Sequence, residues 1–212
     1  MTRAEPEENR LFRWSDQLPA ALWDDLDARP SAQAAEAVGA VWSHGAYRLP
    51  LLGRAYRVDP GARRVSEEAR PGHRVGFQAG LVLASHLGRA LGVPPAGLMV
   101  TPQELPGGSL FFTGPHAVNT KALERRFGGD PEALVRRAAV LGGQPAAVGG
   151  DASVMVPGLP HLPLYVLLWA QDDEFPARAV VGLDAHANHQ LALDGIWALT
   201  NLLVSRLCAE AC

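Results

Sequence analysis

The 212-residue chain has few charged residues, few cysteines and no long hydrophobic run, and each shortage excludes a class of protein. Charged residues make up 19% of the chain, below the usual share of about a quarter, which argues against disorder and against a charge-rich coiled coil. The two cysteines, Cys208 and Cys212, both lie at the C-terminal end, so a disulfide framework is excluded and a reducing compartment is favoured. The longest apolar run, Leu162–Ala170, has nine residues, whereas a membrane-spanning helix needs about 20.

The sequence also has no strong basic patch and no targeting segment. Its formal net charge is −3, and its arginine pairs are short and have acidic neighbours. Because nucleic-acid-binding proteins usually carry a basic patch or stripe, we expect no nucleic-acid partner. Residues 1–12 are predicted to form a flexible, solvated tail that differs from a secretory signal, since Met1–Arg10 holds three glutamates and no apolar run. These features predict a cytoplasmic protein without a membrane partner.

Apolar residues make up 48% of the chain, enough for a sizeable core, and their spacing changes along the sequence. The period is helical over residues 15–40 and in the strongly apolar segment 74–91, and it is strand-like between these segments. The predicted elements of this half are helices over 15–29, 31–40 and 74–91, a hairpin of strands over 47–52 and 55–58, and a short strand over 63–66.

The second half is predicted to contain helices followed by a β-rich meander. Its elements are a short strand over 109–113, helices over 120–128, 131–141 and 191–208, and strands over 152–156, 162–170 and 177–183. The meander is predicted to turn at Pro157–Gly158 and at Asp172–Pro176. Because helices and strands are segregated, we expect an α+β fold with antiparallel sheets packed against helices, in one domain over residues 13–212. The strand 162–170 is apolar throughout, so it should be central.

Several stretches, in this order and spacing, resemble a bacterial and archaeal family catalogued as domain of unknown function 3786. They are Glu104-Leu-Pro-Gly-Gly-Ser-Leu-Phe-Phe-Thr-Gly-Pro-His116, Phe127-Gly-Gly, Leu141-Gly-Gly, Gly150-Asp-Ala, Leu162-Pro-Leu-Tyr, Trp169-Ala-Gln-Asp-Asp-Glu-Phe-Pro-Ala-Arg178 and Asp194-Gly-Ile-Trp197. The resemblance implies no established activity and no catalytic residue. Some members carry an additional cysteine-rich iron–sulfur segment, which hints at redox or corrinoid metabolism. Those cysteines are missing here, so we expect no iron–sulfur cluster.

The last hairpin permits a geometric prediction. If Asp173 and Glu174 form its tip, the numbers of paired residues sum to about 347. His161 then lies opposite His186, roughly 30 Å from the acidic tip at 3.3 Å per residue. We therefore expect two polar ends on one sheet.

The histidine end is one candidate site. His161, Asp184, His186 and His189 offer the imidazole and carboxylate ligands that a divalent metal such as zinc or iron takes. Their spacing matches no strict metal motif, so solvated, unpaired histidines are the alternative interpretation.

The acidic end is a second candidate site. Asp173 and Glu174, next to Asp172, could bind a cation or perform acid–base chemistry, with Arg178 as a neutralising partner. The alternative is a charged tip that keeps the sheet soluble.

A third candidate is the segment from Glu104 to His116. Gly107 and Gly108 allow a close backbone approach to a ligand, and His116 stands at a rigid bend as a possible base or as a metal or haem ligand. A simple surface turn is the alternative. Asp151 is a further ligand-binding candidate, after Gly149–Gly150.

Some residues are assigned to the core instead. His86, in the middle of an apolar helix, is predicted to be a hydrogen-bonded core histidine. Trp169 and Trp197 are also predicted to be buried.

The favoured function is a small-molecule or cofactor-binding protein, in which the Glu104–His116 turn and the β-rich last third hold the ligand, with a tetrapyrrole among the ligands considered. Its basis is an apolar core bordered by convergent polar groups and glycines. A metal-assisted enzyme that uses the carboxylates or histidines at the sheet ends is the first alternative. A protein-interaction module in redox or corrinoid metabolism is the second. The sequence leaves the ligand and the oligomeric state open.

Overall fold

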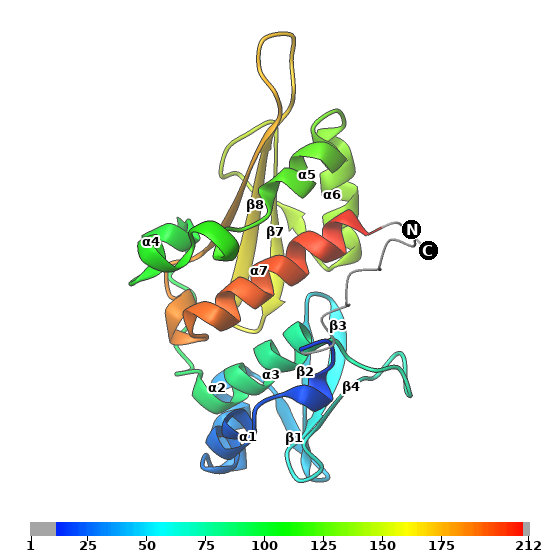
Figure 1. Cartoon of the computed structure of the whole chain (residues 1–212), viewed down its shortest axis with the longest axis vertical. Helices are drawn as coiled ribbons and strands as arrows, with labels where there is room; N and C mark the ends of the chain where they lie inside the picture. Colours follow the sequence, from blue (N-terminus) through cyan, green and yellow to red (C-terminus); the bar gives the residue numbers. More distant parts are fainter. Residues whose placement is uncertain (1–11, 210–212) are drawn as a thin grey trace, which may run out of the picture.

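The computed structural model describes residues 12–209, and it contains two antiparallel sheets with helices packed against them (Figure 1). The first sheet has the order β1-β2-β3-β4 and the second has the order β5-β9-β8-β7-β6. The strands are β1 Val41–Ser43, β2 Ala46–Leu51, β3 Arg54–Asp59, β4 Arg64–Glu67, β5 Met99–Val100, β6 Gln144–Pro145, β7 Ala152–Leu159, β8 Leu162–Trp169 and β9 Arg178–Asp184. The predicted α+β class is confirmed, with an N-terminal hairpin and a C-terminal meander of strands.

The helices of the described chain form mostly where an apolar stripe and an end signal coincide. The α-helices are α1 Ala20–Asp27, α2 Ser31–Val38, α3 Phe77–Arg89, α4 Gly108–Phe111, α5 Thr120–Phe127, α6 Pro131–Val140 and α7 Leu193–Cys208. Short 3-10 turns occur at η1 Ser15–Gln17, η2 Pro102–Glu104, η3 Gly114–His116 and η4 Ala187–His189. The start of α6 follows its sequence signal, because the side chain of Asp130 accepts the Ala133 N–H and Pro131 stands at the first helical position.

The C-terminal hairpin has the predicted register. Leu164 pairs with Leu183 and Trp169 with Arg178, so the paired numbers sum to 347 as expected. Strand β8 is the central strand of its sheet, also as predicted. The side chains at 162, 164, 166 and 168 are fully buried, which fixes one face of this hairpin against the helices. The loop from β8 to β9 projects beyond the helices (Figure 1).

Two buried helices join the two sheets. Helix α3 packs against α7, and α7 crosses the second sheet (Figure 1). Arg206 on α7 reaches the first sheet, where its guanidinium donates to the carbonyls of Leu51 and Leu52 and to the hydroxyl of Tyr56. The apolar residues of both sheets therefore belong to one continuous core.

Three local predictions are wrong. The segment 109–113 is not a strand but lies mostly in helix α4, where the N–H groups of Phe111 and Phe112 donate to the carbonyls of Gly107 and Gly108. The first turn of the meander lies at Pro160–His161 instead of Pro157–Gly158, since β7 continues through a bulge to Leu159. The helix expected over 15–29 is divided into η1 and α1, with Pro19 just before the start of α1.

The predicted tail, residues 1–12, lies outside the described residues except for Phe12. None of the helices within residues 12–209 combines the length and the apolar character that crossing a membrane requires.

Candidate functional site

The loop that joins β8 to β9 is held in shape by its own first carboxylate. One oxygen of Asp172 accepts the N–H groups of Glu174 and Phe175, at 2.9 and 2.6 Å, and Asp172 donates its own N–H to the Phe175 carbonyl. Hydrogen bonds from the Phe175 and Glu174 N–H groups lower the pKa of Asp172, because they favour the ionised form. Asp172 is therefore ionised at neutral pH and fixes the turn.

Helix α5 anchors this loop from the side. The N–H of Gln171 donates to the carbonyl of Gly128, and a Cβ at position 128 would lie 2.4 Å from the Cβ of Ala177. A glycine is therefore needed at the end of α5 to let the loop pass. Further along, the N–H of Ala179 donates to Glu124 at 3.2 Å, so the first residues of β9 are attached to the same helix.

Glu124 also forms an ion pair with Lys121, one turn earlier on α5, at 2.7 Å. Burial raises the pKa of Glu124, but the hydrogen bonds from Lys121 and Ala179 outweigh this effect and keep the pKa below its usual value. On the other side of the loop, the Ala170 N–H donates to Asp151 at 2.7 Å, and Asp151 itself precedes β7. Carboxylates from α5, from the β8–β9 loop and from the residue before β7 therefore all border the end of the hairpin.

These elements border a pocket of about 560 Å³ that is open to solvent, here called the hairpin pocket. Its lining residues are Lys121, Glu124, Asp151, Trp169, Ala170, Asp172, Phe175, Pro176, Ala177 and Arg178. The volume falls within the range of small-molecule sites, roughly 300 to 1,000 Å³. The guanidinium of Arg178 lies over the Trp169 ring, 5.3 Å from its centroid.

The structure brings together some of the predicted acidic-end residues and separates others. Asp151 and Arg178 line the hairpin pocket, whereas Asp173 and Glu174 are exposed in the same loop but do not line it. The prediction that Trp169 belongs to the core is wrong: the residue is 36% exposed, and it lies on the opposite face of β8 from the buried side chains at 162, 164, 166 and 168. Phe175 is 66% exposed. Apolar residues next to the hairpin tip could have indicated that Trp169 and Phe175 line a pocket. Periodicity alone, however, does not distinguish such exposed apolar residues from core residues.

The family comparison covers this hairpin. The model of the family described as Domain of unknown function (DUF3786) matches residues 31–206, most of the chain. The chain belongs to the DUF3786 family. The matched range of the DUF3786 chain includes both sheets and every residue that lines the hairpin pocket. No curated protein and no solved structure matched in the corresponding searches.

In the DUF3786 chain the segment from Glu104 to His116 lies away from the hairpin pocket and has its own local contacts. Glu104 accepts the N–H and the hydroxyl of Thr101, and the hydrogen bond from the Thr101 N–H is the main cause of its lowered pKa. Gly107 adopts a positive φ of 77°. The exposed His116 ring stacks on Phe111, with the ring centroids 4.6 Å apart. Glu104, Gly107 and Gly108 therefore shape a turn, and His116 covers an aromatic residue.

Asp184 and His186 of the histidine end have hydrogen-bond partners in the fold, and the buried Nδ1 of His189 has none among the described residues. Asp184 is fully buried and accepts the N–H groups of Ala96, Gly97 and His186, while the ring of His186 donates to the Pro94 carbonyl and stacks on His189. His161 occupies the β7–β8 turn with a φ of 62°. No three histidine, cysteine or carboxylate side chains among residues 12–209 are grouped so that they could hold a metal ion.

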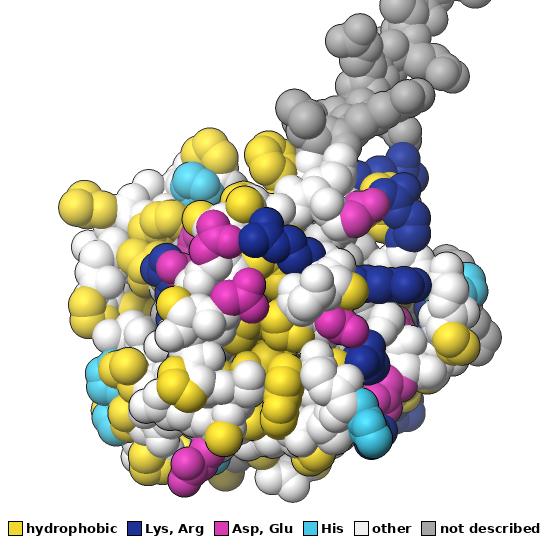
Figure 2. All heavy atoms as spheres, turned by 90° about the horizontal axis from the view of Figure 1, so that it is seen from below, with side chains coloured by type: hydrophobic (Ala, Val, Ile, Leu, Met, Phe, Trp, Pro, Cys, Tyr) yellow, Lys and Arg dark blue, Asp and Glu magenta, His cyan; other side chains and the backbone are white. Residues whose placement is uncertain are grey.

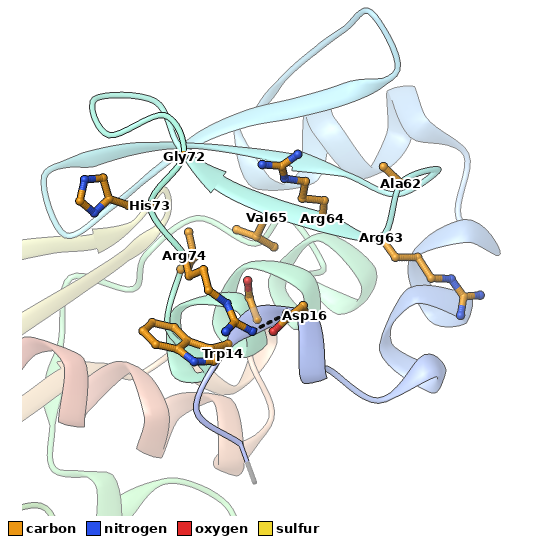
Figure 3. Close-up of a pocket in the computed structure, with 11 residues that line it drawn as sticks. Trp14, Asp16, Ala62, Arg63, Arg64, Val65, Gly72, His73 and Arg74 are labelled. Atoms are coloured by element: carbon orange, nitrogen blue, oxygen red, sulfur yellow. Dashed lines mark hydrogen bonds and ion pairs between the residues drawn. The ribbon is translucent and has the colours of Figure 1, made fainter. Parts of the chain in front are cut away.

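A second pocket, which the sequence reasoning missed, lies beside the first sheet. It has about 330 Å³ and is lined by Arg63, Arg64, His73 and Arg74 together with Trp14 and Asp16, among others. Figure 2 shows the molecule from below the view of Figure 1, and most of the Lys and Arg side chains visible there gather on one side. However, Arg74 turns to Asp16, and Arg63 and His73 extend to opposite sides (Figure 3).

Arg63 also forms an ion pair with Asp24, at 2.8 Å. The cations of this arginine pocket therefore do not converge on one point. The hairpin pocket is the better candidate site.

Proposed function

We propose that the chain binds a small organic molecule in the hairpin pocket. The observation that carries the proposal is the placement of an exposed tryptophan, Trp169, and an exposed phenylalanine, Phe175, on the walls of a cavity of about 560 Å³. Apolar rings that are left open to solvent in a concave site, with a few fixed polar groups beside them, are typical of ligand sites. The hydrogen bonds of Asp151, Asp172 and Glu124 to backbone N–H groups support a site that is formed before the ligand arrives.

The lining favours an organic ligand over a metal-centred one. None of the ten described lining residues is a histidine, cysteine, methionine or tyrosine, the side chains that hold haem iron. A tetrapyrrole in this pocket would therefore be held through its ring face and its carboxylates and not through an axial side chain.

The state of two carboxylates argues against general-acid catalysis in this pocket. The pKa values of Asp172 and Glu124 are lowered by their hydrogen bonds, so both groups are ionised at neutral pH. A general acid needs a proton at the working pH, which a raised pKa would supply. The enzyme alternative therefore has no candidate acid among these two groups.

Native mass spectrometry of the freshly purified protein tests the proposal. We expect the wild-type protein to carry an additional small-molecule mass and Trp169→Ala to lose it, because the variant removes the largest apolar wall. Trp42→Ala is the matched control: Trp42 is 37% exposed, close to the 36% of Trp169, but lies on β1 in the other sheet. A wild-type protein without any bound small molecule, or equal occupancy in the Trp169→Ala variant, would contradict the proposal. If the only additional masses are those of bound proteins, the result would support the protein-interaction module instead.

A further inference from the structure

We infer that the ligand of the hairpin pocket is a small zwitterion: a molecule with an anionic group, a cationic group and an apolar body, such as an apolar amino acid. This inference rests on the proposed function, since it names the class of ligand for the same pocket. It is based on charges of opposite sign that line one cavity without neutralising each other.

Arg178 is the cation that lacks an ionic partner. Three carboxylates line the same pocket, yet within residues 12–209 Arg178 forms no ion pair, and its guanidinium lies over the ring of Trp169. The other lining cation, Lys121, is already paired with Glu124 at 2.7 Å. A planar guanidinium with its N–H groups unused is suited to bidentate binding of a carboxylate. The structure therefore has a place for the anionic group of a ligand beside Trp169.

Asp151 and Asp172 are the corresponding anions. One oxygen of Asp151 accepts the Ala170 N–H, and one oxygen of Asp172 accepts two N–H groups of its own loop. Neither carboxylate forms an ion pair within the described part of the chain. In each case the other carboxylate oxygen has no hydrogen bond to another described residue, so it is available to an ammonium group.

A ligand with charge of only one sign fits this lining less well. With Lys121 and Glu124 neutralising each other, Arg178 contributes one positive charge and Asp151 and Asp172 contribute two negative charges. A purely anionic ligand would approach two carboxylates, and a purely cationic ligand would approach Arg178. A zwitterion places each of its charged groups against an opposite charge, while its apolar body covers Trp169 and Phe175.

Three probes that share one aromatic ring test the inference by isothermal titration calorimetry at pH 7. They are L-phenylalanine, which is zwitterionic, 3-phenylpropanoate, which is anionic, and 2-phenylethylammonium, which is cationic. We expect L-phenylalanine to bind at least tenfold more tightly than either singly charged probe, a difference of about 1.4 kcal/mol. Equal or tighter binding of a singly charged probe, or no binding of any probe, would overturn the inference.

Variants that remove one charge from the pocket show which residue binds the carboxylate of the ligand and which binds its ammonium group. In Arg178→Gln we expect L-phenylalanine to lose its advantage over 2-phenylethylammonium. In Asp151→Asn, which keeps an oxygen for the Ala170 N–H, we expect L-phenylalanine to lose its advantage over 3-phenylpropanoate. Arg136→Gln is the control, because Arg136 is an exposed arginine on α6 outside the pocket.

The two proposals can fail separately. A protein that retains a small molecule in a Trp169-dependent way, but shows no preference for L-phenylalanine, would refute only the ligand class. If no small molecule is retained and no probe binds, the proposed function fails as well.

Discussion

At the scale of single residues, the core contains a titratable side chain in an apolar environment. His86 on α3 is fully buried, and its Nδ1 donates to the carbonyl of Gln190 at 3.2 Å. Burial lowers the pKa of His86 to about 4, because the charged form has no water around it. The prediction of a hydrogen-bonded core histidine is confirmed.

This burial makes the stability of the protein depend on pH. The unfolded chain binds a proton at His86 with a pKa near 6.5, and the folded protein does so only near 4, so stability falls as the pH decreases through this window. We expect His86 to account for a loss of about 2 kcal/mol of unfolding free energy between pH 7 and pH 4.5. Denaturant unfolding at both pH values measures it.

The control for this prediction is His86→Asn, which keeps a donor for the Gln190 carbonyl and does not titrate. Its unfolding free energy should decrease less than that of the wild-type protein over the same pH range. The same decrease in both proteins would show that carboxylates, and not His86, cause the acid sensitivity.

Residue-level prediction from the sequence succeeded where a local environment decides the outcome. His86 sits among apolar helical neighbours, so its burial follows from the pattern alone. The core assignment of Trp169 was wrong because β8 is apolar on both faces, so the sequence pattern does not show which face the helices cover. Arg178 was recognised as a possible neutralising partner, but its position over the Trp169 ring required the register and the side-chain geometry.

At the scale of secondary-structure elements, the hairpin pocket depends on the contact between α5 and the β8–β9 loop. At Gly128 a Cβ would meet Ala177 at 2.4 Å, whereas at Gly129 the nearest atom, in Gln171, is 3.7 Å away. Neither glycine has a positive φ, so alanine differs between the two positions mainly in the space it needs.

We therefore expect Gly128→Ala to destabilise the protein by about 1–3 kcal/mol, the usual cost of overpacking, and to displace the loop. Gly129→Ala should be nearly neutral. Thermal unfolding and the amide NMR shifts of residues 170–178 measure the two effects. Equal stability of the two variants, with unchanged loop shifts, would contradict this account of the contact.

The sequence predicted the register of this hairpin because the acidic turn fixes the tip and every pair follows from it. It did not predict α4, since Ser109-Leu-Phe-Phe-Thr113 has the apolar character of a short strand. Gly108, at the start of α4, packs closely on Pro102, a contact that periodicity does not reveal.

At the scale of the whole molecule, the two sheets share one core, and the two pockets lie on different parts of the molecular surface. The antiparallel α+β class could be predicted because helices and strands are segregated along the chain. The arginine pocket could not, because it brings together η1, β4 and the segment before α3, which only the tertiary fold places side by side. Likewise, the hairpin pocket needs Lys121 and Glu124 from α5, which no motif connects with the acidic loop.

The central claim is that a small molecule occupies the hairpin pocket, and its location can be measured directly. Hydrogen–deuterium exchange should be compared between the protein as purified and the same protein after unfolding, dialysis and refolding to remove the ligand. We expect removal to increase exchange in residues 169–178 and at the start of α5, with no change in the first sheet. Changes confined to residues 104–116 or to the arginine pocket would contradict the account.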